Sequence, residues 1–261
     1  MYFRMKRTKL NAMPKGPFFT LVILTAFVVF SCSSSDDSSD NNPPAQTTAD
    51  IIGSVNLYDE GTNLVNGGGM TVRLIDPSAG STVTDNSGNF TLSDIPAGTY
   101  TLSFEKTGYG TFQIPNLQHA SNGGNTIITE SPSLGQSSST MITGLFAKVV
   151  DDVVRITIAT DPAGNNGNPR YIRYFLSTQA DVSASNYQYN SPGFTVQINP
   201  ANLQFSASDL QGFGFSSGDT VYMKVYGDSF WSNTYTDPDT SLSVYPNLND
   251  TSPAAVSFMV P

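Results

Sequence analysis

The residues that could carry out catalysis are few. His119 is the only histidine in the chain, so a zinc-protease helix motif, a multi-histidine metal site or a Ser-His-Asp relay would have to rely on it. It lies in a loop-like stretch without an acidic neighbour, where we expect an exposed side chain. Two carboxylates could hydrolyse a glycoside, but the glutamates are only Glu60, Glu105 and Glu130. Most aspartates fall in turns, where they bond nearby backbone, so the chain is not expected to be an enzyme.

Two acidic loops could hold a hard cation. Residues 59–63 (DEGTN) and residues 237–239 (DPD) place several oxygen atoms in loops, as calcium requires. Neither spacing matches that of an EF-hand loop, and the same residues form ordinary turns. We therefore expect no metal site and no cofactor, and calcium stays as the minor alternative.

The most distinctive binding candidate is residues 227–237. This segment follows an expected strand and contains the only tryptophan, Trp231, with Phe230 and Tyr235 among small polar residues. Exposed and coplanar rings there would favour stacking on sugar faces. The alternative is that Trp231 fills one end of its own core, because large aromatic side chains are mostly buried. Other rings that could extend such a surface are Tyr187, Tyr189, Phe213 and Phe215.

The first 31 residues predict a cleavable signal peptide. An apolar run, residues 18–30, follows five basic residues, which is the order of a secretory signal. As a helix this run would be roughly 20 Å long, whereas the hydrocarbon core of a membrane is about 30 Å thick. It is therefore too short for a permanent membrane span.

The end of that segment provides a lipidation site. Residues 29–32, VFSC, contain the only cysteine of the chain and resemble the lipobox of bacterial lipoproteins. The resemblance implies that Cys32 becomes the lipidated N-terminus and carries several acyl chains, such as palmitate, which suffice for stable attachment to a membrane. The alternative is an ordinary signal peptide cut elsewhere, which would leave Cys32 as a free thiol.

The charge of the processed chain excludes several partners. All 21 acidic residues follow Cys32, and five of the 12 Lys and Arg residues precede it, which leaves a formal charge of −14. Such a chain repels polyanions and lacks the basic footprint of nucleic-acid binding. Because it is exported, cytoplasmic roles are also excluded.

Residues 32–49 predict a disordered tether. They consist mainly of Ser, Asp, Asn, Pro and Thr, which bury too little apolar surface to become ordered. The acidic start resembles the short signal that sends some lipoproteins of Gram-negative bacteria to the outer face of the outer membrane. A plain solvated linker is the alternative. We expect an outer-membrane protein at the cell surface, with the face of the membrane left open.

From residue 50 onward the apolar pattern has a period of two. Tyr100, Leu102 and Phe104 alternate with polar residues, as in half-buried strands. Turn signals separate such runs at residues 76–80, 85–88 and 95–98. Six or seven short strands fit between residues 50 and 135, which favours a β-sandwich or barrel.

The motifs of this region belong to one recurring arrangement. Residues 85–88 predict a tight hairpin in which Gly88 adopts positive φ, with Phe90 and Leu92 then facing the same core as Tyr100 and Leu102. In this order, TDNSGNFTL (84–92) and IPAGTYTL (95–102) resemble a carboxypeptidase regulatory-like domain over roughly residues 50–117. The resemblance implies a transthyretin-like sandwich and no peptidase activity of its own.

A second unit is expected from residue 138 to residue 261. Asp151-Asp152 between two valine-rich runs indicates a two-residue hairpin without the usual glycine. The unit loosely resembles an immunoglobulin or fibronectin type III sandwich. Its expected strands are residues 141–150, 153–160, 171–177, 194–198, 220–226 and 255–260. The predicted fold is therefore all-β, with two consecutive β-sandwich domains, 50–135 and 138–261.

Two functional classes fit these features. The first is a non-catalytic, lipid-anchored protein of the cell envelope that binds a glycan or a partner protein, as an accessory of an outer-membrane uptake or adhesion system. The second is a structural spacer or assembly subunit without a small ligand. An exposed aromatic group around Trp231 would favour the first class, and its burial would favour the second. The identity of any ligand and the oligomeric state stay open.

Overall fold

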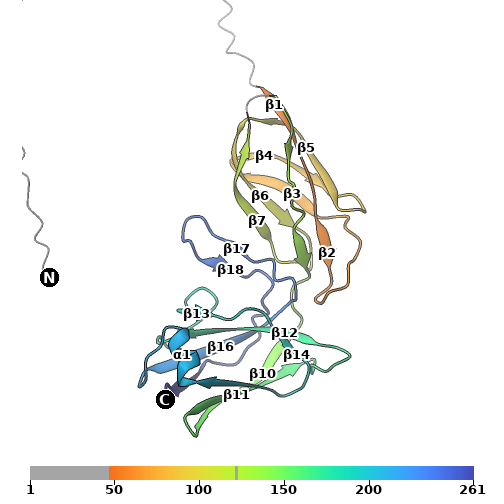
Figure 1. The fold of residues 1–261 in the computed structure, drawn as a ribbon. Helices are drawn as coiled ribbons and strands as arrows, with labels where there is room; N and C mark the ends of the chain where they lie inside the picture. The colour runs from red at the N-terminus through yellow and green to blue at the C-terminus, as the bar shows by residue number, and fades with distance from the viewer. Residues whose placement is uncertain (1–46, 121–122) are drawn as a thin grey trace, which may run out of the picture. The chain divides into compact units, whose positions relative to one another are not determined.

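The computed structural model describes residues 47–120 and 123–261 (Figure 1). Residues Pro44–Pro261 form one compact unit. The expected signal peptide, Cys32 and nearly all of the expected tether lie outside the described residues. Within the described residues, no helix has the length and apolar character needed to cross a membrane.

The N-terminal half of the compact unit is a β-sandwich with two main sheets. The three strands of one sheet, in spatial order, are β5 (Asn89–Pro96), β1 (Thr48–Ser54) and β8 (Thr126–Ile127). The four strands of the other are β4 (Ser78–Val83), β3 (Thr71–Asp76), β6 (Gly98–Glu105) and β7 (Phe112–His119). A short parallel pair completes it, β2 (Asn56–Tyr58) with β9 (Ser133–Gly135). We call this half the first sandwich.

The core of the first sandwich follows the period-two pattern. Tyr100, Leu102 and Phe104 on β6 are all buried, as the alternation predicts. They belong to one apolar cluster with Phe90 and Leu92 of β5, and this prediction is also confirmed. The rings of Phe90 and Phe104 meet edge to face at 5.7 Å, an arrangement that aromatic pairs prefer. Burial of these side chains holds the two sheets together.

The hairpin before β5 forms as the sequence predicts. Gly88 has a φ of +85°, which glycine adopts without steric cost. Asp85 closes the turn, because its Oδ1 accepts the backbone N–H groups of Ser87 at 2.9 Å and of Asn89 at 2.8 Å. Side chain and backbone together therefore fix this turn.

The C-terminal half is a second β-sandwich with its own core. The first of its sheets, in spatial order, consists of β10 (Met141–Val150), β11 (Val153–Asp161) and β15 (Ala201–Ser206). The other consists of β13 (Tyr189–Asn190), β12 (Arg170–Ser177), β16 (Thr220–Asp228) and β19 (Val256–Met259), with β14 (Phe194–Val196) also paired to β12. A separate hairpin is formed by β17 (Tyr235–Thr236) and β18 (Ser243–Val244). We call this half the second sandwich.

All six predicted strands of the second sandwich form, and the structure adds four strands and one helix. Asp151 and Asp152 form the predicted two-residue turn, with φ values of 52° and 58°, and β10 pairs with β11 on either side of it. Strands β13, β15, β17 and β18 were not predicted. The short helix α1 (Ala207–Gly212) was not predicted either, and it begins with a capping box between Ser206 and Asp209.

The segment that links the sandwiches is held by hydrogen bonds. Gln136, Ser137 and Ser138 donate their backbone N–H groups to the carbonyl oxygens of Tyr58, Gly108 and Asn247, respectively. Ser139 N–H donates to Glu60 Oε2 and Thr140 N–H to Ser138 Oγ. Each backbone N–H from residue 136 to residue 140 thus has a protein partner.

Candidate functional site

His119 is buried and structural, so the prediction of an exposed histidine is wrong. The side chain lies at the end of β7 and is 3% exposed. Its Nδ1 lies 2.7 Å from Thr126 Oγ1, and its Nε2 lies 3.1 Å from the carbonyl oxygen of Ile95. Both ring nitrogens therefore join neighbouring strands of the first sandwich.

The acidic loops use their carboxylates to close turns. Asp59 Oδ1 accepts the N–H groups of Gly61 and Asn63, and its Oδ2 accepts Asn63 Nδ2 at 2.7 Å. Asp237 Oδ1 accepts two backbone N–H groups of its own loop. No group of three or more metal-binding side chains occurs among the described residues. Both carboxylate oxygens of Asp59 and Oδ1 of Asp237 are thus hydrogen-bonded within their own loops.

The aromatic segment around Trp231 fits neither sequence interpretation fully. Trp231 is half-buried and packs on Tyr58 of the first sandwich, with ring centroids 4.9 Å apart. Tyr235, on the β17–β18 hairpin, meets Phe112 of β7 edge to face at 6.3 Å. Phe230 is 48% exposed, but its ring is tilted by 79° from that of Trp231. The three rings therefore form no flat stacking platform, and two of them join the sandwiches.

Two buried asparagines fix this segment in place. Asn233 Oδ1 accepts the N–H of Gly135, and Asn233 Nδ2 contacts the carbonyl oxygens of Gly110 and Gly135 at 3.0 Å. Asn247 Oδ1 accepts the N–H of Gly110 and one N–H of Asn233, and Asn247 Nδ2 donates to the carbonyls of Gly135 and Trp231. We call Asn233 and Asn247 the asparagine hub. It connects the first sandwich to the loops around the β17–β18 hairpin.

The hub requires close approach of backbone to backbone. A Cβ atom at Gly135 would lie 2.5 Å from the carbonyl oxygen of Trp231, and one at Gly110 would overlap the backbone of Pro246. Asn233 itself has a φ of 53°, a conformation that asparagine tolerates better than most residues. Side-chain size is thus restricted at Gly110 and Gly135, and backbone conformation at Asn233.

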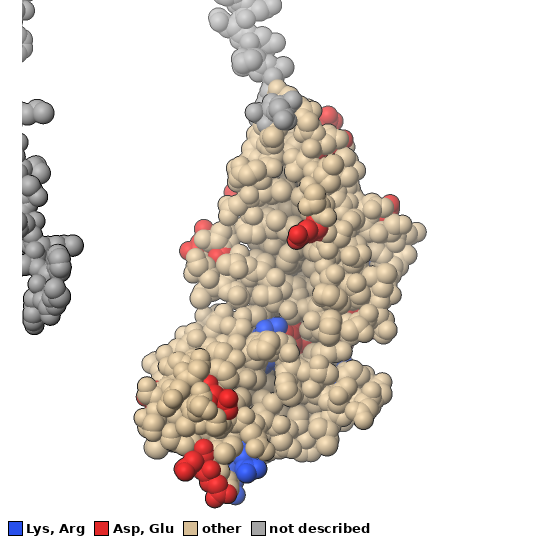
Figure 2. Space-filling model, viewed as in Figure 1, with Lys and Arg blue, Asp and Glu red and all other residues tan. Residues whose placement is uncertain are grey.

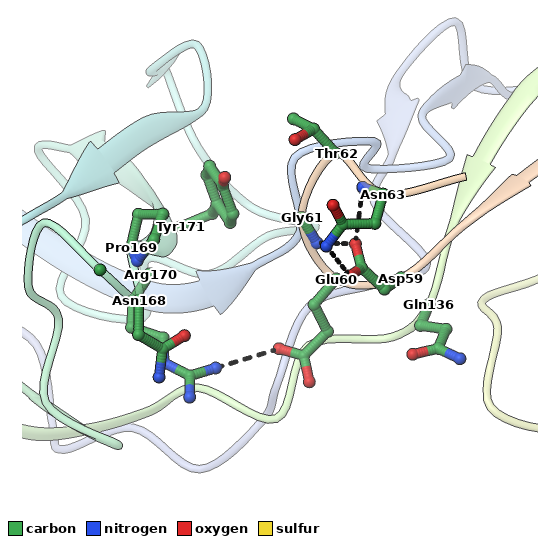
Figure 3. A pocket seen from close by; sticks show the side chains of 11 residues that line it. Asp59, Glu60, Gly61, Thr62, Asn63, Gln136, Asn168, Pro169, Arg170 and Tyr171 are labelled. Carbon is green, nitrogen blue, oxygen red and sulfur yellow. Dashed lines mark hydrogen bonds and ion pairs between the residues drawn. The ribbon is translucent and has the colours of Figure 1, made fainter. Parts of the chain in front are cut away.

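A polar pocket also lies where the two sandwiches meet, a region that we call the junction (Figure 3). Its volume is about 360 Å³. Three segments form it, namely the loop after β2, the residue after β9, and the loop before β12 together with the start of that strand. Its lining residues are Asp59, Glu60, Gly61, Thr62, Asn63, Gln136, Gly167, Asn168, Pro169, Arg170 and Tyr171.

The charges in the pocket are largely compensated. Glu60 Oε2 accepts the N–H of Ser139 at 2.9 Å and lies 3.7 Å from Arg170 Nη1. Arg170 Nε is buried and has no hydrogen-bond partner within the described part of the chain. Burial and the nearby Asp59 carboxylate raise the pKa of Tyr171 above its usual value of 10.0, so its hydroxyl stays protonated at neutral pH. The pocket therefore offers both hydrogen-bond donors and acceptors.

Sequence reasoning did not identify this pocket. The sequence assigns Arg170 to no site, and it indicates Glu60 only as one of three glutamates and as part of a possible calcium loop. A local signal was present, because residues 59–63 and residues 85–89 share the pattern D-x-x-x-N and form the same hydrogen bonds. That pattern predicts the turn but not the pocket beside it, which also needs Arg170 from the second sandwich.

The visible surface carries few charges. Figure 2 shows scattered acidic groups and few basic ones on the face displayed, without a broad basic patch. This distribution agrees with the low content of charged residues, 13% of the sequence. Nothing on this face resembles the basic footprint of a nucleic-acid-binding surface.

Fold and site together define an all-β protein built from β-sandwiches. Residues 60–129 match the sequence model of the carboxypeptidase regulatory-like domain, in agreement with the motifs at residues 84–102. The match covers part of the first sandwich only. No curated protein sequence matches the chain.

Several solved structures are similar at a low level. A Bacteroides uniformis protein with a suggested carbohydrate-binding role is 16% identical, with a TM-score of 0.30, and the match covers 81% of this chain and 99% of that one. A DUF3823 family protein from Parabacteroides merdae is 13% identical, with a TM-score of 0.29 and coverage of 82% and 99%. A chain of a cohesin–X-dockerin complex from Acetivibrio cellulolyticus is 22% identical, with a TM-score of 0.29, and the match covers 34% of this chain and 59% of that one.

Proposed function

We propose that this chain is a non-catalytic, lipid-anchored protein of the cell envelope that binds a glycan or a partner protein. The observation that carries the proposal is the fixed junction between the sandwiches, where a polar pocket lies beside an exposed aromatic ring. Binding to a preformed site costs less conformational entropy than binding to a mobile one. The junction is thus the place where this molecule can bind a ligand at low cost.

Support for a non-catalytic role comes from the state of the titratable groups. Both nitrogens of His119 are hydrogen-bonded inside the first sandwich. In the pocket, Asp59 is bonded within its own loop and Glu60 faces Ser139 and Arg170. A general base must reach its substrate with an available lone pair. These groups are better placed to hold loops and ligands than to transfer protons.

The membrane anchor is proposed from the sequence. Cys32 follows an apolar signal segment and precedes all acidic residues of the chain. Lipid on Cys32 would attach the protein to the outer membrane, at the cell surface, without any membrane-binding face on the sandwiches. The test is metabolic labelling with a palmitate analogue in cells. We expect Cys32→Ala to abolish labelling and membrane retention, and continued labelling would contradict the anchor.

Binding is tested with the compact unit that starts at Pro44. A glycan array and polysaccharide pull-downs, with and without calcium, cover the first ligand class. Cross-linking of the full chain in cells covers partner proteins. Saturable binding of either class supports the proposal. Failure of both screens would leave the second function class, a structural spacer.

One observation favours that second class. Hydrogen bonds hold the link between the sandwiches at every backbone N–H from residue 136 to residue 140. A rigid pair of sandwiches is also what a spacer needs to hold another component away from a membrane. The two classes differ in one respect, because a spacer would tolerate substitutions in the pocket without loss of function.

A further inference from the structure

We propose that the pocket between residues 59–63 and residues 168–171 is a binding site for a neutral saccharide. This inference rests on the proposed binding function and specifies the site and the chemistry of the ligand. It also moves the sugar-binding role from the face of Trp231 to a polar cavity. Its volume of about 360 Å³ lies at the lower end of the range of ligand pockets, roughly 300–1,000 Å³.

The guanidinium of Arg170 has unused hydrogen-bonding capacity at the pocket. Arg170 lines the pocket, and its Nε is buried without a hydrogen-bond partner in the described part of the chain. A buried donor without an acceptor is destabilising. The side chain of Arg170 is only 14% exposed, and its Nη1 is directed to Glu60 (Figure 3). Neither Nη1 nor Nη2 makes a hydrogen bond to the described residues or is fully buried, so these are the two donors of Arg170 that a ligand oxygen in the pocket can reach.

The charges of the pocket disfavour ionic ligands. An anion would meet two carboxylates, Asp59 and Glu60, against the single guanidinium of Arg170. A metal cation would need free carboxylate oxygens, but both oxygens of Asp59 accept hydrogen bonds from its own loop. Glu60 already faces Ser139 N–H and Arg170. A neutral ligand avoids both penalties.

Groups at the rim match the hydroxyls of a sugar. The side chains of Thr62 and Asn168 line the pocket, are exposed and make no hydrogen bond to the described residues. Each can donate and accept, as vicinal hydroxyls also do. Tyr171 adds a protonated hydroxyl. The mixture of donors and acceptors with little apolar surface suits a polyhydroxyl compound better than an apolar one.

Hydrogen bonds and a ring contact within the protein already fix the walls of the pocket. The loop 59–63 is closed by the three hydrogen bonds to Asp59 and joined to the aromatic segment by Phe230 N–H, which donates to the carbonyl of Glu60 at 2.9 Å. The ring of Phe230 packs edge to face on Tyr171 at 5.6 Å. Phe230 thus acts as a positioning residue for the pocket wall.

The experiment is an NMR titration of the compact unit from Pro44. The probes are neutral oligosaccharides, namely hexamers of xylose, mannose, β-1,4-glucose, β-1,3-glucose and N-acetylglucosamine. We expect saturable shifts of the backbone amides of Gly61, Asn168 and Tyr171 with at least one probe. Asn168→Ala and Arg170→Lys should each weaken that binding about tenfold, the effect of losing one hydrogen bond.

Two controls separate binding from folding. Asn168 is exposed and Arg170→Lys keeps the charge, so neither variant should change the melting temperature by more than a few degrees. Arg155→Ala removes an exposed arginine of β11 that does not line the pocket and should bind like the unaltered protein.

The outcomes are separable from those of the proposed function. Sugar binding that maps outside the pocket, or that survives both variants, overturns the pocket assignment and leaves the proposed function intact. The absence of shifts with every probe overturns the saccharide assignment. A partner captured by cross-linking in cells would then still support the proposed function, whereas its absence would overturn that as well.

Discussion

The asparagine hub and the polar pocket, which both lie at the junction, differ in how far their polar side chains are hydrogen-bonded. At the asparagine hub, the side chains of Asn233 and Asn247 are 4% and 0% exposed, and both ends of each amide are hydrogen-bonded. At the pocket, Arg170 retains a buried Nε without a partner in the described chain, while Thr62 and Asn168 face solvent. We call the hub the closed side of the junction, because its amides are fully hydrogen-bonded, and the pocket the open side, because it retains polar groups without a partner in the described chain.

This contrast indicates that the asparagine hub stabilises the fold, whereas the pocket is available to a ligand. A buried polar network with all its bonds made stabilises one arrangement of the chain. A network with a missing acceptor has a reason to take up a ligand. The four buried side-chain atoms without a partner among the described residues, Thr140 Oγ1, Arg170 Nε, Ser229 Oγ and Trp231 Nε1, all belong to segments that meet at the junction.

The largest effect is expected from opening the closed side. Asn247→Ala removes two acceptor contacts and two donor contacts and leaves the buried N–H of Gly110 without its partner. The free energy of unfolding should fall by about 2–4 kcal/mol. Denaturant unfolding of the compact unit measures this loss, and limited proteolysis should then cut within residues 136–140.

The matched control is an asparagine on the open side. Asn168→Ala removes an exposed amide without a protein partner in the described chain, so the free energy of unfolding should change by less than about 0.5 kcal/mol. Equal losses for the two asparagines would show that the distinction between hub and pocket is wrong.

A smaller effect is expected from the aromatic contact across the junction. Trp231→Ala removes a half-buried ring that packs on Tyr58. We expect a loss of about 2 kcal/mol in thermal or denaturant unfolding, below the roughly 3–5 kcal/mol typical of a fully buried ring. Unchanged stability with lost glycan binding would instead return Trp231 to the role of a stacking surface.

Phe230→Ala serves as the comparison for Trp231. Its side chain is 48% exposed, so its removal should cost less than about 1 kcal/mol of stability. Because Phe230 packs on Tyr171, the same variant should still perturb the backbone amide of Tyr171 in an NMR spectrum. A silent Tyr171 amide would contradict the positioning role of Phe230.

Much of each sandwich could be predicted because local patterns encode it. The alternation on β6 predicts which side chains are buried, and the Asp151-Asp152 turn follows from two strands with no room for a longer loop. Helix α1 has only six residues and was therefore hard to predict. Its capping box has an aspartate, Asp209, in place of the commoner glutamate. Propensity over so few residues carries little information.

The junction could not be predicted from local patterns. Asn233 and Asn247 are ordinary loop residues in sequence, and their partners at Gly110 and Gly135 lie about a hundred positions away. The sequence predicts Trp231 either on the surface or in the core of its own sandwich, but its ring packs on Tyr58 of the other sandwich. Contacts between two sandwiches leave no periodic signal, because only single residues take part.

The ion pair on the open side should contribute less than either the hub or Trp231. Glu60→Gln keeps an acceptor for Ser139 but removes the charge that faces Arg170. We expect a loss of about 1 kcal/mol, smaller in 1 M salt than in 0.1 M salt because the side chains are partly exposed. Glu105→Gln, which removes a more exposed pair with Arg73, should cost less than about 0.5 kcal/mol. A larger loss of unfolding free energy for Glu105→Gln than for Glu60→Gln would contradict the greater contribution expected from the less exposed pair.

Acid should distinguish buried from exposed carboxylates without a large change in stability. Burial raises the pKa of Asp228 above 3.8, although its hydrogen bond to Arg173 Nε opposes this shift. Hydrogen bonds from Asn89, Ser87 and Gly88 lower the pKa of Asp85 below 3.8.

The two shifts have opposite consequences for stability. As the pH falls, Asp228 is protonated in the folded state before it is protonated in the unfolded state. The unfolding free energy therefore increases as the pH falls through the raised pKa of Asp228 towards 3.8. The contribution of Asp85 is present above pH 3.8 and is lost as the pH falls through its lowered pKa. Carboxyl ¹³C titration by NMR should therefore find Asp228 protonating before Asp85. The reverse order would mean that Arg173 outweighs burial at Asp228, and that this buried ion pair stabilises the second sandwich at neutral pH.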